Sequence, residues 1–286
     1  MSVVPRLEDA PRFFNRTRSI PSVPRQLLAD GRAYLIPLYY LLLSSDLGRE
    51  AVAGSGSFRF ADHLYRREPS GRWGFGRAID RILMQFPSSC SFRSRYVHAR
   101  DAIGEYLAGH RADDHLSILS VPCGIARELV EAARELRATD ASTYGRTQWT
   151  GVDLDPEPLE LTERLVAEHG LCRFDLLCRD AFGPQGLPSG QSLITSTGFG
   201  EFLSDDELTR FYGSCRAALQ QGGWFVTSGM NRHPLSDYLL RALADVRVHY
   251  RGPEELMSVL KATGFVPIRV SSDRYGLQTL VVAKRP

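Results

Sequence analysis

Acidic side chains stand at the ends of two predicted strands, where a polar ligand could reach them. Asp153 and Asp155 follow the apolar run 149–152, and Asp180 follows a second run at 173–178. Carboxylates accept hydrogen bonds from hydroxyl and amino groups. Because ligands of α/β sheets bind beyond the carboxyl ends of the strands, these side chains are expected to line one small-molecule site.

A tight turn between a strand and a helix supplies the second part of this site. Residues 116–121 form a β-branched and leucine-rich run, which Pro122-Cys123-Gly124 interrupts. The helix N-terminus after this turn presents free backbone N–H groups and a positive dipole end to a ligand. Its apolar residues recur three and four positions apart, at Leu129, Val130, Ala133 and Leu136.

These motifs resemble the first two motifs of class I S-adenosylmethionine (SAM) dependent methyltransferases of the bacterial small-molecule type. The resemblance rests on the turn at 120–124 and on the strand Trp149-Thr150-Gly151-Val152-Asp153-Leu154-Asp155-Pro156, and it extends over residues 115–284. It implies a Rossmann-like α/β fold, a doubly wound seven-stranded mixed sheet, with SAM as the cofactor.

An NAD-binding domain is the competing interpretation of a strand–turn–helix unit. Such a domain needs the pattern G-x-G-x-x-G, whereas this turn carries one glycine, Gly124, between Pro122 and Ala126. A pyrophosphate could not approach the backbone closely there. The predicted C-terminal hairpin, 265–270 and 277–283, is typical of the methyltransferase sheet and argues against a dehydrogenase.

The resemblance also implies roles for residues at the ends of four strands. Asp153 is expected to hold the ribose hydroxyls, Asp180 the exocyclic amine of adenine, and Phe182 to pack on the adenine ring; Asp180 could instead cap a turn. Metal ligands are not expected. The expected cofactor-binding residues are Ser120, Pro122, Cys123, Gly124, Asp153, Leu154, Asp155, Asp180, Ala181, Phe182, Ser196, Thr197 and Gly198.

One position departs from the family pattern at the amino-acid end of the cofactor. The family usually has an acid where this chain has Ser120, and that acid helps to orient the methionine portion of SAM. Serine can donate or accept a hydrogen bond but cannot balance the charge of an ammonium group. How this end of the cofactor is held therefore stays open.

The substrate side of the site has fewer markers in the sequence. His233 is the histidine that follows the fifth predicted strand, and its pKa range suits a general base; the alternative is a loop histidine before Pro234. Residues expected to line the substrate site or a lid are Tyr39, Tyr40, Trp73, Phe75, Phe199, Glu201 and Asn231.

Residues 1–110 have no counterpart in the family core and are expected to form an N-terminal arm and helical cap, with the SAM-binding domain at 111–286. This part carries 16 arginines against 10 acids, and arginines alternate with aromatics over 58–76. Such a pattern can bind nucleic acid, but the arginines form no dense block, so a lid over a small ligand is preferred. The apolar run 34–43 is too short to span a membrane.

Cysteine usage and loop signals complete the prediction. The cysteines at 90, 123, 172, 178 and 215 are odd in number and lack a C-x-x-C pair, which with no signal peptide indicates a reduced cytoplasmic protein. Cys123 is expected to serve packing rather than catalysis. Residues 140–146 are expected to form a loop, and the Gly/Pro-rich stretch 183–190 leaves little room for a crossover helix.

The predicted function is transfer of the SAM methyl group to a small molecule, in bacterial specialised metabolism, without nucleic-acid or membrane partners. Two alternatives stay open. A SAM-consuming cyclase of the same fold would make azetidine-2-carboxylate and methylthioadenosine, and Ser120 in place of an acid would favour the neutral amine that it needs. A SAM-binding protein without chemistry is the other. The acceptor and the oligomeric state are not predicted.

Overall fold

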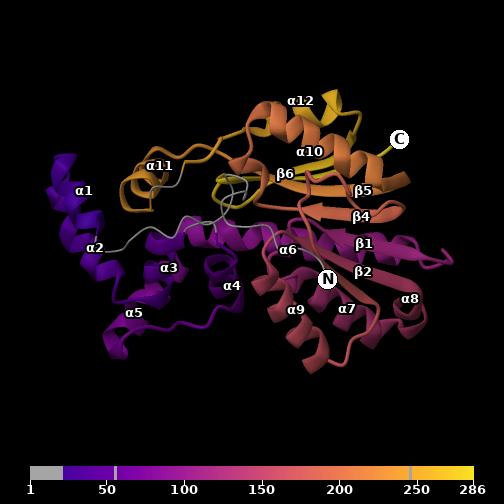
Figure 1. Cartoon of the computed structure of the whole chain (residues 1–286), viewed down its shortest axis with the longest axis horizontal. Helices are drawn as coiled ribbons and strands as arrows, with labels where there is room; N and C mark the ends of the chain where they lie inside the picture. Colours follow the sequence, from indigo (N-terminus) through magenta and orange to yellow (C-terminus); the bar gives the residue numbers. More distant parts are fainter. Residues whose placement is uncertain (1–21, 55–56, 245–246) are drawn as a thin grey trace. The chain divides into compact units, whose positions relative to one another are not determined.

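The computed structural model describes residues 22–54, 57–244 and 247–286 and divides into two compact units (Figure 1). A helical unit comprises the chain up to Ser89 together with residues 234–247. A sheet unit comprises residues 90–233 and 248–286. Each unit is described separately below.

The sheet unit contains a seven-stranded mixed sheet in the order β3-β2-β1-β4-β5-β7-β6 (Figure 1). The five strands from β3 to β5 in this order pair in parallel, and β7 runs antiparallel to both of its neighbours, β5 and β6. This topology confirms the predicted class I methyltransferase fold. The strands are β1 Leu116–Ser120, β2 Thr147–Asp153, β3 Phe174–Cys178, β4 Gln191–Ser196, β5 Leu219–Met230, β6 Val266–Ser272 and β7 Gln278–Lys284.

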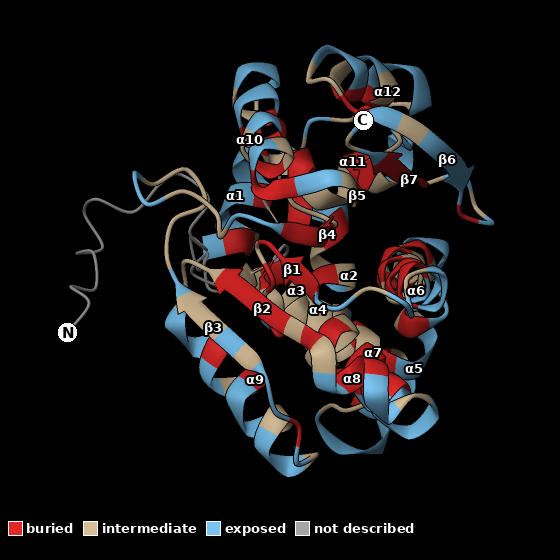
Figure 2. Ribbon diagram, turned by 90° about the vertical axis from the view of Figure 1, so that its right-hand side faces the viewer, coloured by how far each residue is buried: buried red, intermediate tan, exposed pale blue. Residues whose placement is uncertain are grey.

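Helices pack against both faces of this sheet, and the innermost strands are buried (Figure 2). On one face, apolar residues of α6 and α7 share a core with Ile118 of β1 and Leu193 of β4. On the other face, α10 packs on β5, with Tyr212 Oη 3.0 Å from Thr227 Oγ1. The helices of this unit are α6 Pro87–Gly109, α7 Arg127–Thr139, α8 Ala141–Arg146, α9 Pro156–Glu168, η4 Gly200–Phe202, α10 Asp205–Ala218 and α12 Pro253–Ala262.

Local capping signals start two of these helices as the sequence indicates. Asp155 accepts a hydrogen bond from the Glu157 N–H at the start of α9. Ser204 and Glu207 form a reciprocal capping box at the start of α10. The stretch 179–190 between β3 and β4 contains no helix, which confirms the prediction from its glycines and prolines.

The prediction of a loop over residues 140–146 is wrong, because this segment forms α8. Asp140 caps the short helix by accepting hydrogen bonds from Thr143 N at 3.0 Å and Thr143 Oγ1 at 2.7 Å. Tyr144 of the same helix is buried and its hydroxyl accepts a hydrogen bond from Cys172 N at 2.8 Å. A side-chain cap and tertiary contacts stabilise six residues that have little intrinsic periodicity.

The two units divide at residues 89 and 90 rather than at 110 and 111, where the sequence suggested a boundary. Most of α6 therefore belongs to the sheet unit. The reason lies in the packing of its C-terminal half, since Ala99, Ala102, Ile103, Tyr106 and Leu107 are buried in the same core as β1 and α7.

The helical unit has its own small core. Val23, Leu27, Leu35, Tyr39 and Val52 are buried there with Ala242 and Leu243 from the later segment. Residues 1–19, expected to be a polar arm, lie outside the described residues. The helices of this unit are α1 Val23–Ala29, η3 Ala33–Leu35, α2 Ile36–Leu42, α3 Asp46–Gly54, α4 Phe58–Arg66, α5 Trp73–Met84, α11 Pro234–Leu239 and the π-helix η5 Leu240–Ala244.

A charged cluster joins α3, α4 and α5 inside this unit. The His63 ring lies between two carboxylates, with Nδ1 3.0 Å from Glu50 Oε2 and Nε2 3.1 Å from Asp80 Oδ2. Burial opposes the charged ring, but the hydrogen bonds with Asp80 and Glu50 outweigh it and raise the pKa of His63 to about 10. Asp80, which is fully buried, also accepts hydrogen bonds from Ser45 Oγ, Leu47 N and Ser70 N at 2.5, 2.8 and 3.1 Å.

We expect His63→Gln to lower the stability of the helical unit by about 3 kcal/mol at pH 7, because the buried Asp80 loses its cation. The imidazolium contributes fully below pH 6.5, and its contribution is lost as the pH rises towards 10, since the folded pKa exceeds the ordinary value. Amide hydrogen exchange over α3–α5 measures the effect. His115→Gln, at an exposed position, is the control; equal protection in parent and variant would refute the prediction.

Candidate cofactor and acceptor site

Asp153 joins the ends of β1 and β2 through two backbone hydrogen bonds. Its Oδ2 accepts from Gly124 N at 2.7 Å, and its Oδ1 accepts from Asp155 N at 3.0 Å. Gly124 has φ +51, a left-handed conformation that favours glycine. Burial raises the pKa of Asp153, against the lowering effect of these two hydrogen bonds. The carboxylate therefore orients the turn after β1.

The hydrogen-bonding capacity of Asp153 fits the ribose diol of SAM. Each carboxylate oxygen has two lone pairs, and each accepts one backbone N–H from the turn or from the chain after β2. Each oxygen can accept one further hydrogen bond, which matches two neighbouring hydroxyl groups. The side chain is half-buried, so a ligand can reach it.

Cys123 has a packing role in the turn. The cysteine is buried, and its Sγ would lie 3.1 Å from a Cβ placed on Gly151 of β2. Burial raises the pKa of its thiol well above the ordinary value. A nucleophile would need the opposite shift.

The expected adenine end lies after β3. Asp180 Oδ1 accepts a hydrogen bond from Phe182 N at 2.8 Å, so Asp180 caps its own turn with one oxygen and keeps the other for a further donor. The Phe182 ring centroid lies 5.8 Å from that of Phe211 and 6.4 Å from that of Phe199. Half-buried residues follow this edge of the sheet from β1 to β4: Pro122, Gly124, Leu154, Asp155, Asp180, Ala181, Phe182, Thr197 and Gly198.

A buried ion pair stands at the end of β4. Arg95 Nη1 donates to Glu201 Oε1 at 2.8 Å, and the Arg95 guanidinium carbon lies 3.4 Å from the centroid of the Phe92 ring. Gly198, at φ +81, makes room for the guanidinium, since a Cβ there would lie 2.3 Å from Arg95 Cζ. Glu201 is 3% exposed, and within the described part of the chain its Oε2 has no hydrogen-bond partner.

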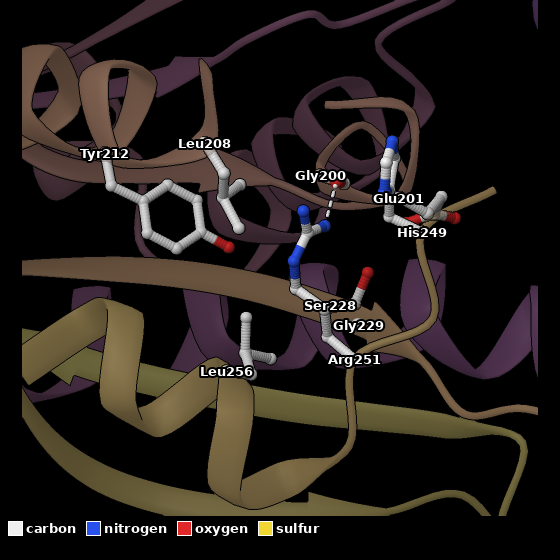
Figure 3. Close-up of a pocket in the computed structure, with 9 residues that line it drawn as sticks. All are labelled: Gly200, Glu201, Leu208, Tyr212, Ser228, Gly229, His249, Arg251 and Leu256. Atoms are coloured by element: carbon white, nitrogen blue, oxygen red, sulfur yellow. Dashed lines mark hydrogen bonds between the residues drawn. The ribbon is translucent and has the colours of Figure 1, made fainter. Parts of the chain in front are cut away.

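Arg251 fastens the loop that carries Glu201 (Figure 3). Its Nη1 donates to Gly200 O at 2.8 Å and its Nη2 to Leu203 O at 2.7 Å. His249 N donates to the Glu201 carbonyl at 2.7 Å. The small pocket drawn in Figure 3 is thus occupied by a structural arginine, and it holds Glu201 in position from the backbone side.

An acid that was not predicted from the sequence lies close to Ser120. Ser120 Oγ donates to Glu128 Oε1 at 2.6 Å. Glu128 lies in the first turn of α7, eight positions along the chain, and nothing in its spacing marks it as a partner of Ser120. The cyclase alternative depended on the absence of a carboxylate at this place, and the contact removes that support.

Burial raises the pKa of Glu128 to about 7, opposed by the hydrogen bond from Ser120 and assisted by the negative charge of Glu131. The ionised form of the Glu128 carboxyl group is therefore disfavoured in the folded protein. Its proton is half-dissociated near neutral pH, in the range where the protein would bind a cation.

The residues predicted to line the substrate side of the site lie in different environments. Asn231 holds the C-terminal hairpin, donating to Gly276 O at 2.9 Å and accepting from Thr279 Oγ1 at 3.0 Å. His233 is exposed after β5. In the helical unit Tyr39 is buried in the core, whereas Tyr40, Trp73 and Phe75 are exposed. Tyr39 therefore serves packing, and Asn231 has its side chain engaged by backbone and hydroxyl partners.

A family model with the description "Putative methyltransferase" matches residues 41–285. The chain belongs to this methyltransferase family. The matched range includes α3, α4, α5, α11 and η5 of the helical unit, whereas α1 and η3 lie before it. Among the described residues, no helix has the length and apolar character needed to cross a bilayer.

The chain is also similar to a curated protein of Escherichia coli. The chain is 22% identical over 257 residues to the uncharacterized protein YnbC of Escherichia coli strain K12, covering 85% of this chain and 42% of that protein. It therefore spans less than half of that relative.

Two crystal structures illustrate the likeness. A protein from Bordetella parapertussis described as a possible exported protein has a TM-score of 0.77 and 25% identity, covering 93% of this chain and 94% of that one. Magnesium protoporphyrin IX methyltransferase from Synechocystis PCC 6803, with bound SAH, has a TM-score of 0.55 and 12% identity, covering 79% and 93%. The family match assigns the chain to this methyltransferase family, and the likeness to the Synechocystis enzyme shows that the chain shares the class I methyltransferase fold.

The raised pKa of Glu128 predicts a pH-dependent stability. The folded protein holds this proton more tightly than the unfolded chain, so stability falls as the pH rises from 4.5 to about 7. Glu128→Gln removes the titration, and we expect it to raise the Tm at pH 8 while changing it little at pH 4.5. Calorimetry at both pH values measures this, with Glu131→Gln as control. An equal loss at both would contradict the prediction.

Proposed function

We propose that this protein binds SAM along the ends of β1, β2 and β3 and transfers its methyl group to a small-molecule acceptor in bacterial specialised metabolism. The observation that carries the proposal is the Asp153 carboxylate, held by the Gly124 and Asp155 N–H groups with one acceptor position left on each oxygen. When bound, SAM supplies a methyl group on a positively charged sulfur.

The cofactor residues orient the reactive group by fixing the two ends of the nucleoside. Asp153 accepts hydrogen bonds from the ribose, Asp180 accepts from the adenine amine, and Phe182 packs on the ring. Methyl transfer needs an in-line arrangement of nucleophile, methyl carbon and sulfur, so precise positioning supplies much of the rate. The likeness to the SAH-bound Synechocystis methyltransferase, at low identity, supports the fold. The hydrogen-bond acceptors Asp153 and Asp180 support SAM as the ligand.

Glu201 is our candidate for the acceptor end. Its Oε1 is taken by Arg95 and its Oε2 is buried without a partner among the described residues, an arrangement that costs stability unless a ligand donates to it. Bound SAM would supply its methyl group to the acceptor's nucleophile, an amine or hydroxyl, and the sulfur would keep the electron pair of the broken carbon–sulfur bond. The proton of the nucleophile moves to Glu201 Oε2.

The overall activity is tested with SAM and fractionated small-molecule extract, following S-adenosylhomocysteine by mass spectrometry. We expect this product only when an acceptor fraction is present. The protein with SAM alone serves as the control, since methylthioadenosine forming there faster than in a protein-free blank would indicate the cyclase instead. Tight SAM binding without product from any fraction would indicate a protein that binds SAM without chemistry.

The free thiols support a proposal for the compartment. All five cysteines are free, which suits a reducing environment, and we place the enzyme in the cytoplasm. The Bordetella relative carries a different description, so fractionation of cells that express the protein is the direct measurement.

Asp153→Ala is expected to weaken SAM binding by about 2 kcal/mol, roughly thirtyfold, because the ribose loses a charged hydrogen-bond acceptor. Isothermal titration calorimetry with SAM measures this. Asp175→Asn is the matched control, since Asp175 is exposed on β3 and bonds only to Gln148 in the described structure. An affinity of Asp153→Ala within about threefold of the parent would refute the ribose assignment.

Glu201→Gln and His233→Ala distinguish the two candidates for proton acceptor. We expect Glu201→Gln to lower kcat at least tenfold with SAM affinity unchanged, since glutamine keeps the contact with Arg95 but takes up no proton. His233→Ala should leave kcat within about twofold. Once an acceptor fraction gives product, single-turnover rates measure both; the reverse order of effects would transfer the role to His233.

A further inference from the structure

Ser120 and Glu128 form a hydrogen-bonded pair at the end of β1, and this pair has no role in the proposed methyl transfer. Ser120 is 3% exposed, and its hydroxyl donates to Glu128 Oε1 at 2.6 Å. Glu128 itself is half-buried, so its other oxygen can face a ligand. A serine that donates to a carboxylate orients it but leaves its charge unbalanced.

Within residues 22–54, 57–244 and 247–286, no cation balances the charge of Glu128. Among the residues that the structure describes, Glu128 forms no ion pair with an arginine or lysine. The nearby Arg100 of α6 lies 3.7 Å from Glu131 instead. A partly buried carboxylate without a cation is costly, which points to a positive group that is supplied by a ligand.

A second polar group lies beside the pair without a partner. Thr195 of β4 is the register partner of Ser120, so both side chains are on the same face of the sheet. Thr195 is 1% exposed, and its hydroxyl has no hydrogen-bond partner within the described residues. The ends of β1 and β4 thus present a carboxylate and a free hydroxyl together.

The position of this pair relative to Asp153 matches one end of SAM. The sheet order β3-β2-β1-β4 puts the adenine end at β3 and the ribose at β2. The remaining part of the ligand, an amino acid joined to the ribose through sulfur, continues in the same direction, to β1 and β4. Its α-ammonium group would therefore reach the place where Ser120, Glu128 and Thr195 lie.

We propose that Glu128, oriented by Ser120, binds the α-ammonium group of SAM. The inference rests on the proposed SAM site and deepens it. This chain then carries the acid for the amino-acid end in the first turn of α7 rather than at the end of β1, where it has serine. Thr195 supplies a second hydrogen-bonding group to the same end.

Other ionisable groups around Glu128 do not substitute for it. Glu131 on the same helix lies 3.7 Å from Arg100 of α6. Burial raises the pKa of Tyr96 of α6, and the negative charges of Glu131 and Glu128 raise it further, so Tyr96 stays neutral. Cys123 in the turn also stays neutral because burial raises its pKa. Asp153 of β2 is engaged by two backbone N–H groups. Glu128 is therefore the carboxylate that a cation at this point would meet.

The test compares SAM with methylthioadenosine, each measured on the parent and on the variant. Methylthioadenosine keeps the nucleoside and the methylthio group but lacks the amino-acid chain with its ammonium and carboxylate groups, and its sulfur is uncharged. We expect Glu128→Gln to weaken SAM at least about tenfold in calorimetric titration and to leave methylthioadenosine within about twofold. Glu131→Gln should change neither ligand, and Asp153→Ala should weaken both.

A rescue and a proton measurement separate binding from structure. Adding Ser120→Asp to Glu128→Gln should restore SAM affinity, because a carboxylate returns to the same place from β1. At pH 6, where Glu128 is largely protonated, SAM binding to the parent should release close to one proton, measured from binding heats in buffers of different ionisation enthalpy. Glu128→Gln should release none.

The outcomes distinguish this inference from the proposed function. SAM affinity of Glu128→Gln within about threefold of the parent, or equal weakening of SAM and methylthioadenosine, would overturn the role of Glu128 while leaving the cofactor site intact. Failure of the parent to bind either ligand would overturn the SAM site itself. Proton release that persists in Glu128→Gln would assign the titrating group elsewhere.

Discussion

The site depends on one constraint, the need of the partly buried Asp153 carboxylate for hydrogen-bond donors. A desolvated carboxylate is stable only when donors reach it, and here the donors are the backbone N–H groups of Gly124 and Asp155. The same two bonds set the course of the turn after β1 and of the chain entering α9. The group that would receive the ribose is therefore also the group that shapes its surroundings, and its replacement affects binding and local structure together.

Both units contain buried or partly buried carboxylates, but these differ in how fully protein groups satisfy them. In the helical unit, His63 lies between Glu50 and Asp80, and the cluster is internally balanced. In the sheet unit, Glu201 keeps an oxygen that no donor among the described residues fills, and Glu128 forms no ion pair with an arginine or lysine in that part of the chain. Sites that bind ligands commonly retain such incomplete groups at a cost in stability. The contrast separates the carboxylates that hold the fold from those that are available for a ligand.

Much of the sheet unit could be predicted from short patterns. The apolar run ending at Val121 and the acid after Val152 each depend on local propensity, and they lie where predicted. Residues 140–146 could not be predicted in this way, because α8 is stabilised by the Asp140 cap and by the contact of Tyr144 with Cys172. The boundary of the units escaped prediction for a similar reason, since the apolar residues of α6 do not by themselves indicate which core they enter.

The sequence by itself determined the order of the elements, the turn geometry at Gly124 and the acids that end β2 and β3, because each depends on residues close together in the chain. Only the tertiary structure decided which distant side chains share a site. Glu128 approaches Ser120 because α7 packs back on β1, and Arg95 pairs with Glu201 because α6 crosses the end of β4, where Gly198 leaves room for a guanidinium. The spacing of these residues in the sequence does not reveal the pairs, because the packing of helices on the sheet brings them together.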